Sequence, residues 1–221
     1  MIERLHDRSQ AGQLLATKLA TFGNRPDVVI LGLPRGGVPV ACEIAKSLGA
    51  DLDVFLVRKV GVPGYEELAL GAIASGGVKI IDLDVAEEFG LRPGDIETLV
   101  RAEQKELQRR EAVFRGSRPM PDLHNRTVVL VDDGIATGST MRAAIEGVKI
   151  LGATHFIVAA GVMPLSTSLR LRSEVEDVVS LLTPRDFRAV GLFYEQFPQL
   201  SDDDVCALLE NAWKSGARNA A

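Results

Sequence analysis

The sequence predicts an α/β protein with a mainly parallel sheet and helices on both of its faces. Two uninterrupted apolar runs, residues 28–33 and 128–131, are typical of strands that are buried on both sides. Each run leads through a short loop of small residues into a stretch with the apolar spacing of a helix. Because this order of strand, loop and helix recurs along the chain, we expect parallel strands joined by crossover connections.

The remaining elements follow from apolar periodicity and from residues that start or stop helices. The first helix is expected to start at Ser9 or Gln10 and to end at Gly23. Further helices are expected over residues 38–48, 93–114, 141–151 and 165–175, and after a capping Ser201. Further strands are expected over residues 53–57, 69–75, 78–83, 154–162 and 178–182. Residues 60–68 contain two glycines, a proline and two glutamates, and this composition predicts a mobile surface loop.

The composition narrows the class of protein. The chain has 221 residues, of which 46% are hydrophobic, and it can therefore bury a substantial core. Its net charge of −5 argues against a nucleic-acid partner. Cys42 and Cys206 lack metal-ligand spacing, and the sequence shows no membrane span and no signal peptide, so we expect a cytoplasmic protein with no membrane partner.

The stretch at residues 127–151 carries the clearest chemical pattern. An apolar strand ends in two adjacent carboxylates, Asp132 and Asp133, and a Gly/Thr/Ser loop then opens a helix. Backbone N–H groups at a helix N-terminus favour an anion such as phosphate. The carboxylates cannot bind phosphate but suit hydroxyl groups or a metal-bound partner, so the pattern predicts a sugar phosphate as ligand. Loops after Leu33 and Val57 are expected at the same edge of the sheet, where ligands of α/β proteins bind.

These residues carry a resemblance to a known family. The run VVLVDDGIATGST, residues 128–140, resembles the phosphoribosyl-diphosphate (PRPP) motif of type I phosphoribosyltransferases. The residues PRGG at 34–37 resemble the family's pyrophosphate loop, and residues 60–68 lie where the family has a flexible catalytic loop. The resemblance implies a Rossmann-like sheet with a core at about 28–182, a hood from 183–200 and the N-terminus, one domain over 1–215, and a flexible tail at 216–221.

The resemblance also implies a role for individual residues. Asp132 and Asp133 would hold the ribose hydroxyls. The 5′-phosphate would be wrapped by five consecutive residues, which are Ala136, Thr137, Gly138, Ser139 and Thr140. Pyrophosphate would be held by Arg35, Gly36 and Gly37, where glycines let the backbone approach closely.

Further roles in catalysis follow from the charge of the reaction. Arg35, Arg58 and Lys59 would neutralise the departing pyrophosphate, and a closing loop would exclude water from the oxocarbenium-like centre. The family uses PRPP as its Mg²⁺ complex, and the metal bridges mostly substrate oxygens with Asp132 and Asp133 nearby. No direct protein ligand set for the metal is visible in the sequence.

One position departs from part of the family. Hypoxanthine/guanine-type members have an acid where this chain has Ala136, so the chain is more similar to adenine- and uracil-type members. An acid for a nucleobase would then come from elsewhere, and Glu66 and Glu67 are the candidates. Phe193 or Tyr194 is a candidate for stacking on a base, although packing in the core is the alternative role for both.

Two functions of different classes remain open at this stage. The first is a Mg²⁺-dependent phosphoribosyltransferase that acts on PRPP and an undetermined nitrogen nucleophile, with a nucleobase as one candidate. The second is a non-catalytic regulatory protein that binds PRPP. Paired acids at a strand end also occur in receiver domains and in Mg²⁺-dependent phosphatases, but those phosphatases have Asp-x-Asp followed by Gly-Thr, whereas Asp132 and Asp133 are adjacent. The family suggests a homodimer.

Overall fold

The computed structural model describes residues 3–219, apart from the side chains of residues 66, 67 and 216–219. Its centre is a five-stranded parallel sheet with the strand order β2-β1-β6-β7-β8, which confirms the predicted α/β class. The strands are β1 (Val28–Gly32), β2 (Asp51–Val54), β6 (Thr127–Gly134), β7 (His155–Val162) and β8 (Asp177–Leu182). The two strands at the centre of the predicted site, β1 and β6, are direct neighbours.

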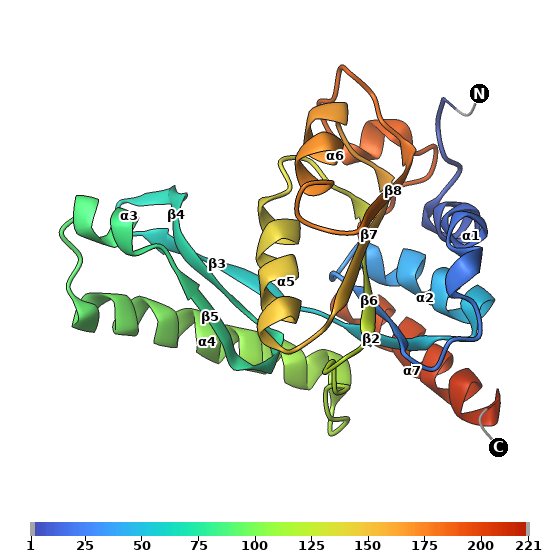
Figure 1. Cartoon of the computed structure of the whole chain (residues 1–221), viewed down its shortest axis with the longest axis horizontal. Coiled ribbons are helices and arrows are strands. Elements are labelled where there is room, and N and C mark those ends of the chain that lie inside the picture. Colours follow the sequence, from blue (N-terminus) through green and yellow to red (C-terminus); the bar gives the residue numbers. More distant parts are fainter. Residues whose placement is uncertain (1–2, 220–221) are drawn as a thin grey trace.

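Helices cover both faces of this sheet (Figure 1). One face carries α1 (Arg8–Lys18), α2 (Gly37–Leu48) and α7 (Asp202–Asn219). The other face carries α5 (Ser139–Ile150) and α6 (Leu165–Leu171). Side chains of β6 alternate between the two layers: Val129 and Val131 pack toward the first face, and Val128 and Leu130 toward the second. A strand buried on both sides in this way has to read as a continuous apolar run.

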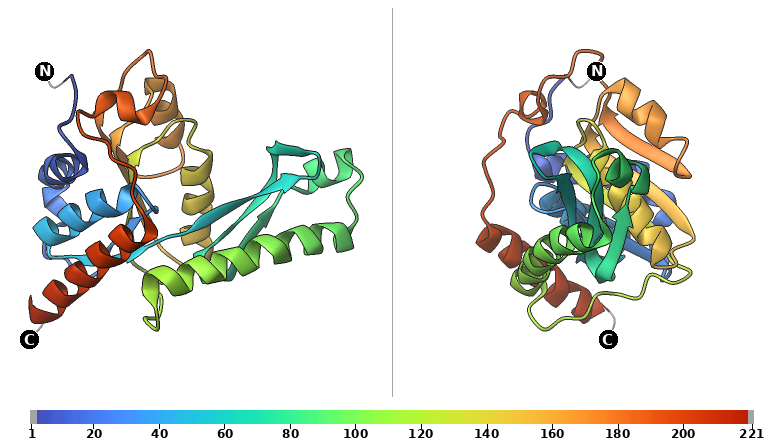
Figure 2. Two further views of the ribbon diagram at one scale, coloured as in Figure 1. Left: turned by 180° about the vertical axis from the view of Figure 1, so that it is seen from behind. Right: turned by 90° about the vertical axis from the view of Figure 1, so that its left-hand side faces the viewer.

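A second, antiparallel sheet projects from the core as an arm (Figures 1 and 2). It consists of β3 (Val57–Val62), β4 (Tyr65–Ala74) and β5 (Val78–Ile81), with the 3₁₀ turn η2 (Ser75–Gly77) between the last two. The helix α3 (Leu83–Glu88) lies at the outer end, and α4 (Pro93–Arg115) returns along the sheet to the core. We call these elements the arm.

The expected mobile loop over residues 60–68 is wrong, because most of this segment belongs to the hairpin of β3 and β4. Gly64 has a φ of +78° in the connecting turn, so the glycine that suggested a loop permits a tight reversal. The strand expected at residues 53–57 exists but is shifted, since β2 covers Asp51–Val54 and Val57 already belongs to β3. The helix α3 has no counterpart among the predicted elements.

The first helix also starts earlier than predicted. Asp7 is its N-cap, because the Asp7 Oδ1 atom accepts a hydrogen bond of 2.8 Å from Gln10 N, and Arg8 is therefore helical. A short 3₁₀ turn, η1 (Ala20–Phe22), follows this helix. At the C-terminal helix, Ser201 caps α7 as predicted, with its hydroxyl accepting from Asp204 N at 3.1 Å.

The N-terminus and the segment at residues 183–200 lie together. Leu5 pairs with Tyr194 in a parallel bridge that follows the 3₁₀ turn η3 (Val190–Phe193). This places the two segments proposed for the hood side by side above the sheet. The backbone of α7 extends to Asn219, into the expected tail, and residues 220–221 lie outside the described residues. None of the helices within residues 3–219 is long and apolar enough to cross a membrane.

Candidate functional site

The phosphate loop follows β6 and opens α5. Ala136, Thr137, Ser139 and Thr140 are exposed, and Gly138 is buried at the helix N-cap with a φ of +84°. The Thr137 and Ser139 hydroxyls lie 3.2 Å apart. The loop is fastened from outside by Thr167, whose hydroxyl donates to Ala136 O at 2.7 Å. The loop therefore presents two adjacent hydroxyls on a fixed backbone.

The N-terminus of α5 has no side-chain cap. Gly138 has no side chain that can accept a hydrogen bond from the first N–H groups of the helix, and the Ser139 N–H makes only a long contact of 3.5 Å to Thr137 Oγ1. Unsatisfied N–H groups at a helix N-terminus carry a partial positive charge and bind anions. An anion bound at this N-terminus would complete its hydrogen bonding.

The two acids at the end of β6 have different surroundings, although they are adjacent in the sequence. By strand alternation, Asp132 leaves β6 on the face covered by α5, and Asp133 leaves it on the face covered by α1 and α2. Asp132 is half-buried, whereas Asp133 is buried. The two carboxylates therefore do not form one symmetrical pair.

Asp133 is held by groups from both ends of the chain. The Nε atom of Arg8 donates to its Oδ2 at 2.7 Å, and the same guanidinium lies 3.8 Å from the ring centroid of Phe197. The Tyr194 hydroxyl donates to the backbone carbonyl of Asp133 at 2.6 Å. Tyr194 is only 1% exposed, so it has the packing role and does not face a ligand. Asp133 thus anchors the N-terminal and C-terminal segments to the sheet.

Asp132 has no such cation beside it. The backbone N–H of Asp133 donates to Asp132 Oδ1 at 2.8 Å. Burial and the negative charge of Asp133 together raise the pKa of Asp132 well above its usual value, and Arg8 counters this effect only weakly. An incompletely satisfied carboxylate at the end of a central strand is suited to accept hydrogen bonds from ligand hydroxyls.

The pyrophosphate loop lies directly against the end of β6. Leu33 N donates to Val131 O at 2.8 Å, and the peptide between Pro34 and Arg35 is cis. A Cβ on Gly36 would lie 2.0 Å from Asp133 Oδ2, and a Cβ on Gly37 would lie 2.4 Å from Val131 O. Both positions therefore require glycine for close approach of the backbone, as the sequence suggested.

The three cations predicted to neutralise pyrophosphate, Arg35, Arg58 and Lys59, have different surroundings. Arg35 is exposed at the loop, and its Nη1 lies 3.7 Å from Asp202 Oδ1 at the start of α7. Arg58 lies on β3, where its Nε forms a 2.6 Å ion pair with Glu103 of α4. Lys59, the next residue of this strand, is exposed and points to the opposite side of β3 from Arg58. Arg35 belongs to the pyrophosphate loop and Arg58 borders it, whereas Lys59 leaves β3 on the other side.

The two loop glutamates lie far from this loop in the fold. Glu66 and Glu67 belong to the outer end of β4, at the tip of the arm (Figure 1). Their side chains are outside the described part of the structure. No described contact supports the nucleobase role predicted for them, and this role stays a prediction.

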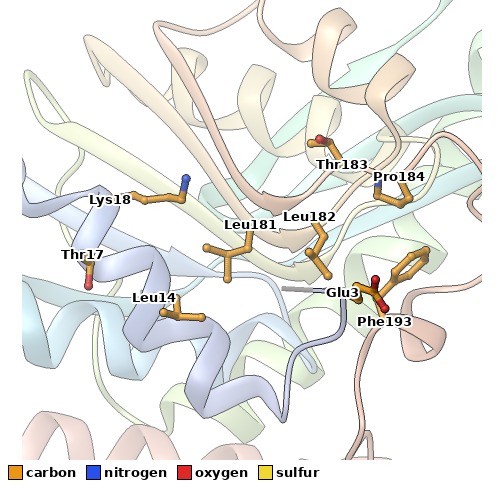
Figure 3. A pocket seen from close by; sticks show the side chains of 9 residues that line it. All are labelled: Glu3, Leu14, Thr17, Lys18, Leu181, Leu182, Thr183, Pro184 and Phe193. Carbon is orange, nitrogen blue, oxygen red and sulfur yellow. The ribbon is translucent and has the colours of Figure 1, made fainter. Parts of the chain in front are cut away.

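A larger groove of about 570 Å³ lies elsewhere, between α1, the end of β8 and η3 (Figure 3). Its walls include Leu14 and Lys18 of α1, Leu182 of β8 and Phe193. Phe193 also stacks on Phe187, with ring centroids 5.6 Å apart. Of the residues considered for the site, only Phe193, a candidate for stacking on a base, lines this groove. Among the described side chains, no cluster of three or more His, Cys, Asp or Glu is arranged to hold a metal ion.

Two residues of the site region were missed by sequence reasoning. Arg8 lies in a helix far from β6 in the sequence, and nothing in its neighbourhood indicates a contact with Asp133. Arg110 lies within the helix predicted over residues 93–114, and nothing in the sequence assigns it to the site. In the structure it lines a small cavity together with Pro34, Arg58 and Thr140. Both contacts depend on the tertiary packing of α1 and α4, and no local motif encodes them.

Comparison with known proteins gives concordant results. A family model described as phosphoribosyl transferase domain matches residues 2–194. A Mycobacterium tuberculosis protein named “Putative phosphoribosyl transferase” is 45% identical over 215 residues, which are 97% of this chain and 48% of that protein. The Bifunctional protein PyrR of Corynebacterium glutamicum is 28% identical over 133 residues, covering 60% of this chain and 51% of that protein. The chain thus spans about half the length of these curated relatives.

The crystal structure of the Thermus thermophilus protein TT1426 is similar over nearly the whole chain. It is 42% identical, covers 94% of this chain and 98% of its own, and has a TM-score of 0.84. The family model covers most of the residues that form the sheet, both anion loops and the arm. The chain therefore belongs to the phosphoribosyl transferase domain family.

Proposed function

We propose that this chain transfers the 5-phosphoribosyl group from PRPP to a nitrogen nucleophile, with a nucleobase as the candidate acceptor, and releases pyrophosphate. The observation that carries the proposal is the contact between the pyrophosphate loop and the end of β6. The pyrophosphate loop at Gly36 and Gly37 packs against the end of β6, from which Asp132 and the phosphate loop extend. The site thus offers an anion loop, a carboxylate for hydroxyl groups and a second anion loop. A ligand with phosphate groups at both ends and hydroxyls between them fits this arrangement.

Each part of the site has a distinct task in this reaction. The N–H groups of α5 with the Thr137 and Ser139 hydroxyls bind the 5′-phosphate. Asp132 accepts hydrogen bonds from the ribose hydroxyls and so fixes the ring between the loops. Arg35 stabilises the negative charge that develops on the departing pyrophosphate, and it does so most strongly in the transition state. Asp133 fixes the end of β6 and has its carboxylate engaged by Arg8.

Mg²⁺ is the expected cofactor. The described residues provide single carboxylates at the site and no cage, which fits an ion that keeps several waters and is carried mainly by substrate phosphates. Asp132 is the side chain best placed to contact the hydrated ion, because its carboxylate has no cationic partner among the described contacts. When bound, the ion would neutralise phosphate charge.

The test is a measurement of pyrophosphate release. The protein is incubated with PRPP, Mg²⁺ and a panel of nucleobases, and the Arg35→Ala variant is compared with the wild type. We expect release with at least one base, a loss of turnover of about 100-fold in the variant because one preorganised donor is removed, and an unchanged melting temperature.

Two outcomes would contradict the proposal in different ways. Tight PRPP binding without release for any base would favour the alternative of a non-catalytic, PRPP-binding regulatory protein. Unchanged turnover in Arg35→Ala would remove Arg35 from the site while leaving the transfer reaction in place. The homodimer suggested by the family and the cytoplasmic location suggested by the sequence are separate proposals, and sedimentation and cell fractionation would test them.

A further inference from the structure

We infer that Arg110 of α4 is an additional cation of the pyrophosphate subsite. Before pyrophosphate binds, the carboxylate of Asp202 in α7 occupies the place of the anion beside Arg110. The inference rests on the proposed function and extends it to two residues outside the motifs. Arg110 lies in the arm, far from Arg35 in the sequence. Asp202 lies in the first turn of the C-terminal helix.

The first observation is a small cavity between the two anion loops. Its lining includes Pro34 from the pyrophosphate loop and Thr140 from the phosphate loop, with Arg58 and Arg110 from the arm. The cavity measures only about 30 Å³. Two guanidinium groups thus border the narrow space that separates the loops, and a phosphoryl group would have to bind at its mouth.

The second observation is the position of the Asp202 carboxylate. Its Oδ1 lies 3.7 Å from Arg35 Nη1 and also 3.7 Å from Arg110 Nη2. This oxygen is buried and has no hydrogen-bond partner among the described residues. Both distances are too long for a hydrogen bond. A negatively charged oxygen therefore lies between two guanidinium groups without satisfying either.

This geometry suits exchange of one anion for another. Guanidinium groups bind phosphate oxygens through paired N–H donors, and such charge-assisted bonds are stronger than a loose ion pair. A buried acceptor without a donor is unfavourable, so Asp202 loses little when Arg35 and Arg110 turn to a phosphate. Arg58 is less available, because its Nε is already engaged by Glu103 at 2.6 Å. Arg110 is then the arm's best candidate for a second cation on the leaving group.

A purely structural role is the competing explanation. In that case Arg110 and Asp202 would only fasten α7 to α4, and substitution of either residue would weaken the fold in the same direction. If they act on pyrophosphate, the two substitutions have opposite effects on its affinity. Removing Arg110 takes away a cation, whereas removing the charge of Asp202 takes away a competing anion.

The experiment measures binding of pyrophosphate by calorimetry to the full chain and to Arg110→Ala and Asp202→Asn. We expect the dissociation constant to rise about tenfold in Arg110→Ala, since a charge-assisted contact is lost. We expect it to fall several-fold in Asp202→Asn. Arg110→Lys keeps the charge without the paired donors and should fall between the wild type and Arg110→Ala.

Matched controls exclude general effects of charge. Arg101→Ala removes another arginine of α4, one whose ion pair with Glu97 is exposed. Asp203→Asn removes an exposed acid from the same first turn of α7 and the same favourable charge at its N-terminus. Both controls should leave the dissociation constant of pyrophosphate unchanged, and thermal melting checks that every variant folds.

The outcomes separate the inference from the proposed function. Wild-type protein that binds neither PRPP nor pyrophosphate would overturn both. Wild-type protein that binds both ligands, with equal dissociation constants for Arg110→Ala and the wild type, would overturn only the inference. A loss of affinity in Asp202→Asn as well as in Arg110→Ala would assign the two residues a structural role.

Discussion

The parallel core and the arm differ in how they hold their polar groups. At the end of β6, polar contacts are few and buried, and Asp133 is fixed by the guanidinium of Arg8 at 2.7 Å. Along α4, charged residues form exposed pairs within the helix, such as Arg101 with Glu97 and Arg109 with Glu106. The same kinds of side chain therefore occur in two regions with very different access to water.

This difference indicates where individual residues matter. Exposed ion pairs contribute little to stability because water and salt screen them, typically about 0–1 kcal/mol. A buried charge that loses its partner costs several kcal/mol. The core should therefore respond strongly to single substitutions, and the arm should respond only where it joins the core or borders the site.

The junction between the two regions should show the largest effect. Arg115 at the end of α4 forms a 3.0 Å ion pair with Asp53 of β2, and their side chains are 5% and 1% exposed. Burial raises the pKa of Asp53 despite this partner. Arg115→Ala should reduce the free energy of unfolding by about 3–5 kcal/mol, measured by denaturant titration, because it leaves a buried carboxylate unpaired.

Two controls define this result. Arg109→Ala in the exposed part of the same helix should cost less than about 1 kcal/mol. Replacing both partners, Asp53→Leu with Arg115→Met, should recover much of the loss, since no charge then remains buried. Equal losses for Arg109→Ala and Arg115→Ala would show that the contrast between the regions is false.

The second prediction concerns Asp132 and has the opposite sign. The pKa of Asp132 is raised in the folded protein, so the folded protein binds this proton more tightly than the unfolded chain does. Ionisation of Asp132 therefore disfavours folding. Its favourable contribution is thus complete below the unfolded pKa and is lost as pH rises through the raised folded pKa. Asp132→Asn should therefore stabilise the protein at neutral pH, because the amide carries no charge to bury.

The pH dependence of thermal melting provides the measurement. The gain in melting temperature for Asp132→Asn should be largest above the folded pKa and should shrink toward acid pH. PRPP binding should weaken in the same variant, as expected for a residue that costs stability and serves a ligand. A variant that is less stable than the wild type at neutral pH would show that Asp132 is satisfied within the fold.

The core could be predicted from the sequence because its signals are local. Strands β1 and β6 are buried on both faces, so they must be apolar throughout, and each ends in a loop whose glycines are required by close contacts. The arm could not be predicted in the same way. Gly61 and Gly64 resemble loop residues, but in the structure they accommodate a register shift and a tight turn within a hairpin.

Within the site, too, the sequence predicts the residues of local motifs and not those that arrive by tertiary packing. The acids and the two anion loops are adjacent in sequence to the strands that carry them, and their types were sufficient to predict their neighbourhood. Arg8, Tyr194 and Arg110 reach the same region from distant helices and segments. Their roles depend on how α1, α4 and the C-terminal segment pack, and one sequence contains no local pattern that specifies such contacts.

The smallest effect is expected at the outer end of the arm. Tyr65 is 63% exposed, and its ring lies 5.4 Å from that of Phe89, next to α3. Tyr65→Ala removes one aromatic pair, worth about 0.5–1.5 kcal/mol. Because few buried residues connect this end to the core, opening should remain local. Hydrogen exchange should speed up in α3 while the amides of β6 keep their protection. Faster exchange in β6 would mean that the arm and the core unfold as one unit, and the contrast between them would then concern polar contacts alone.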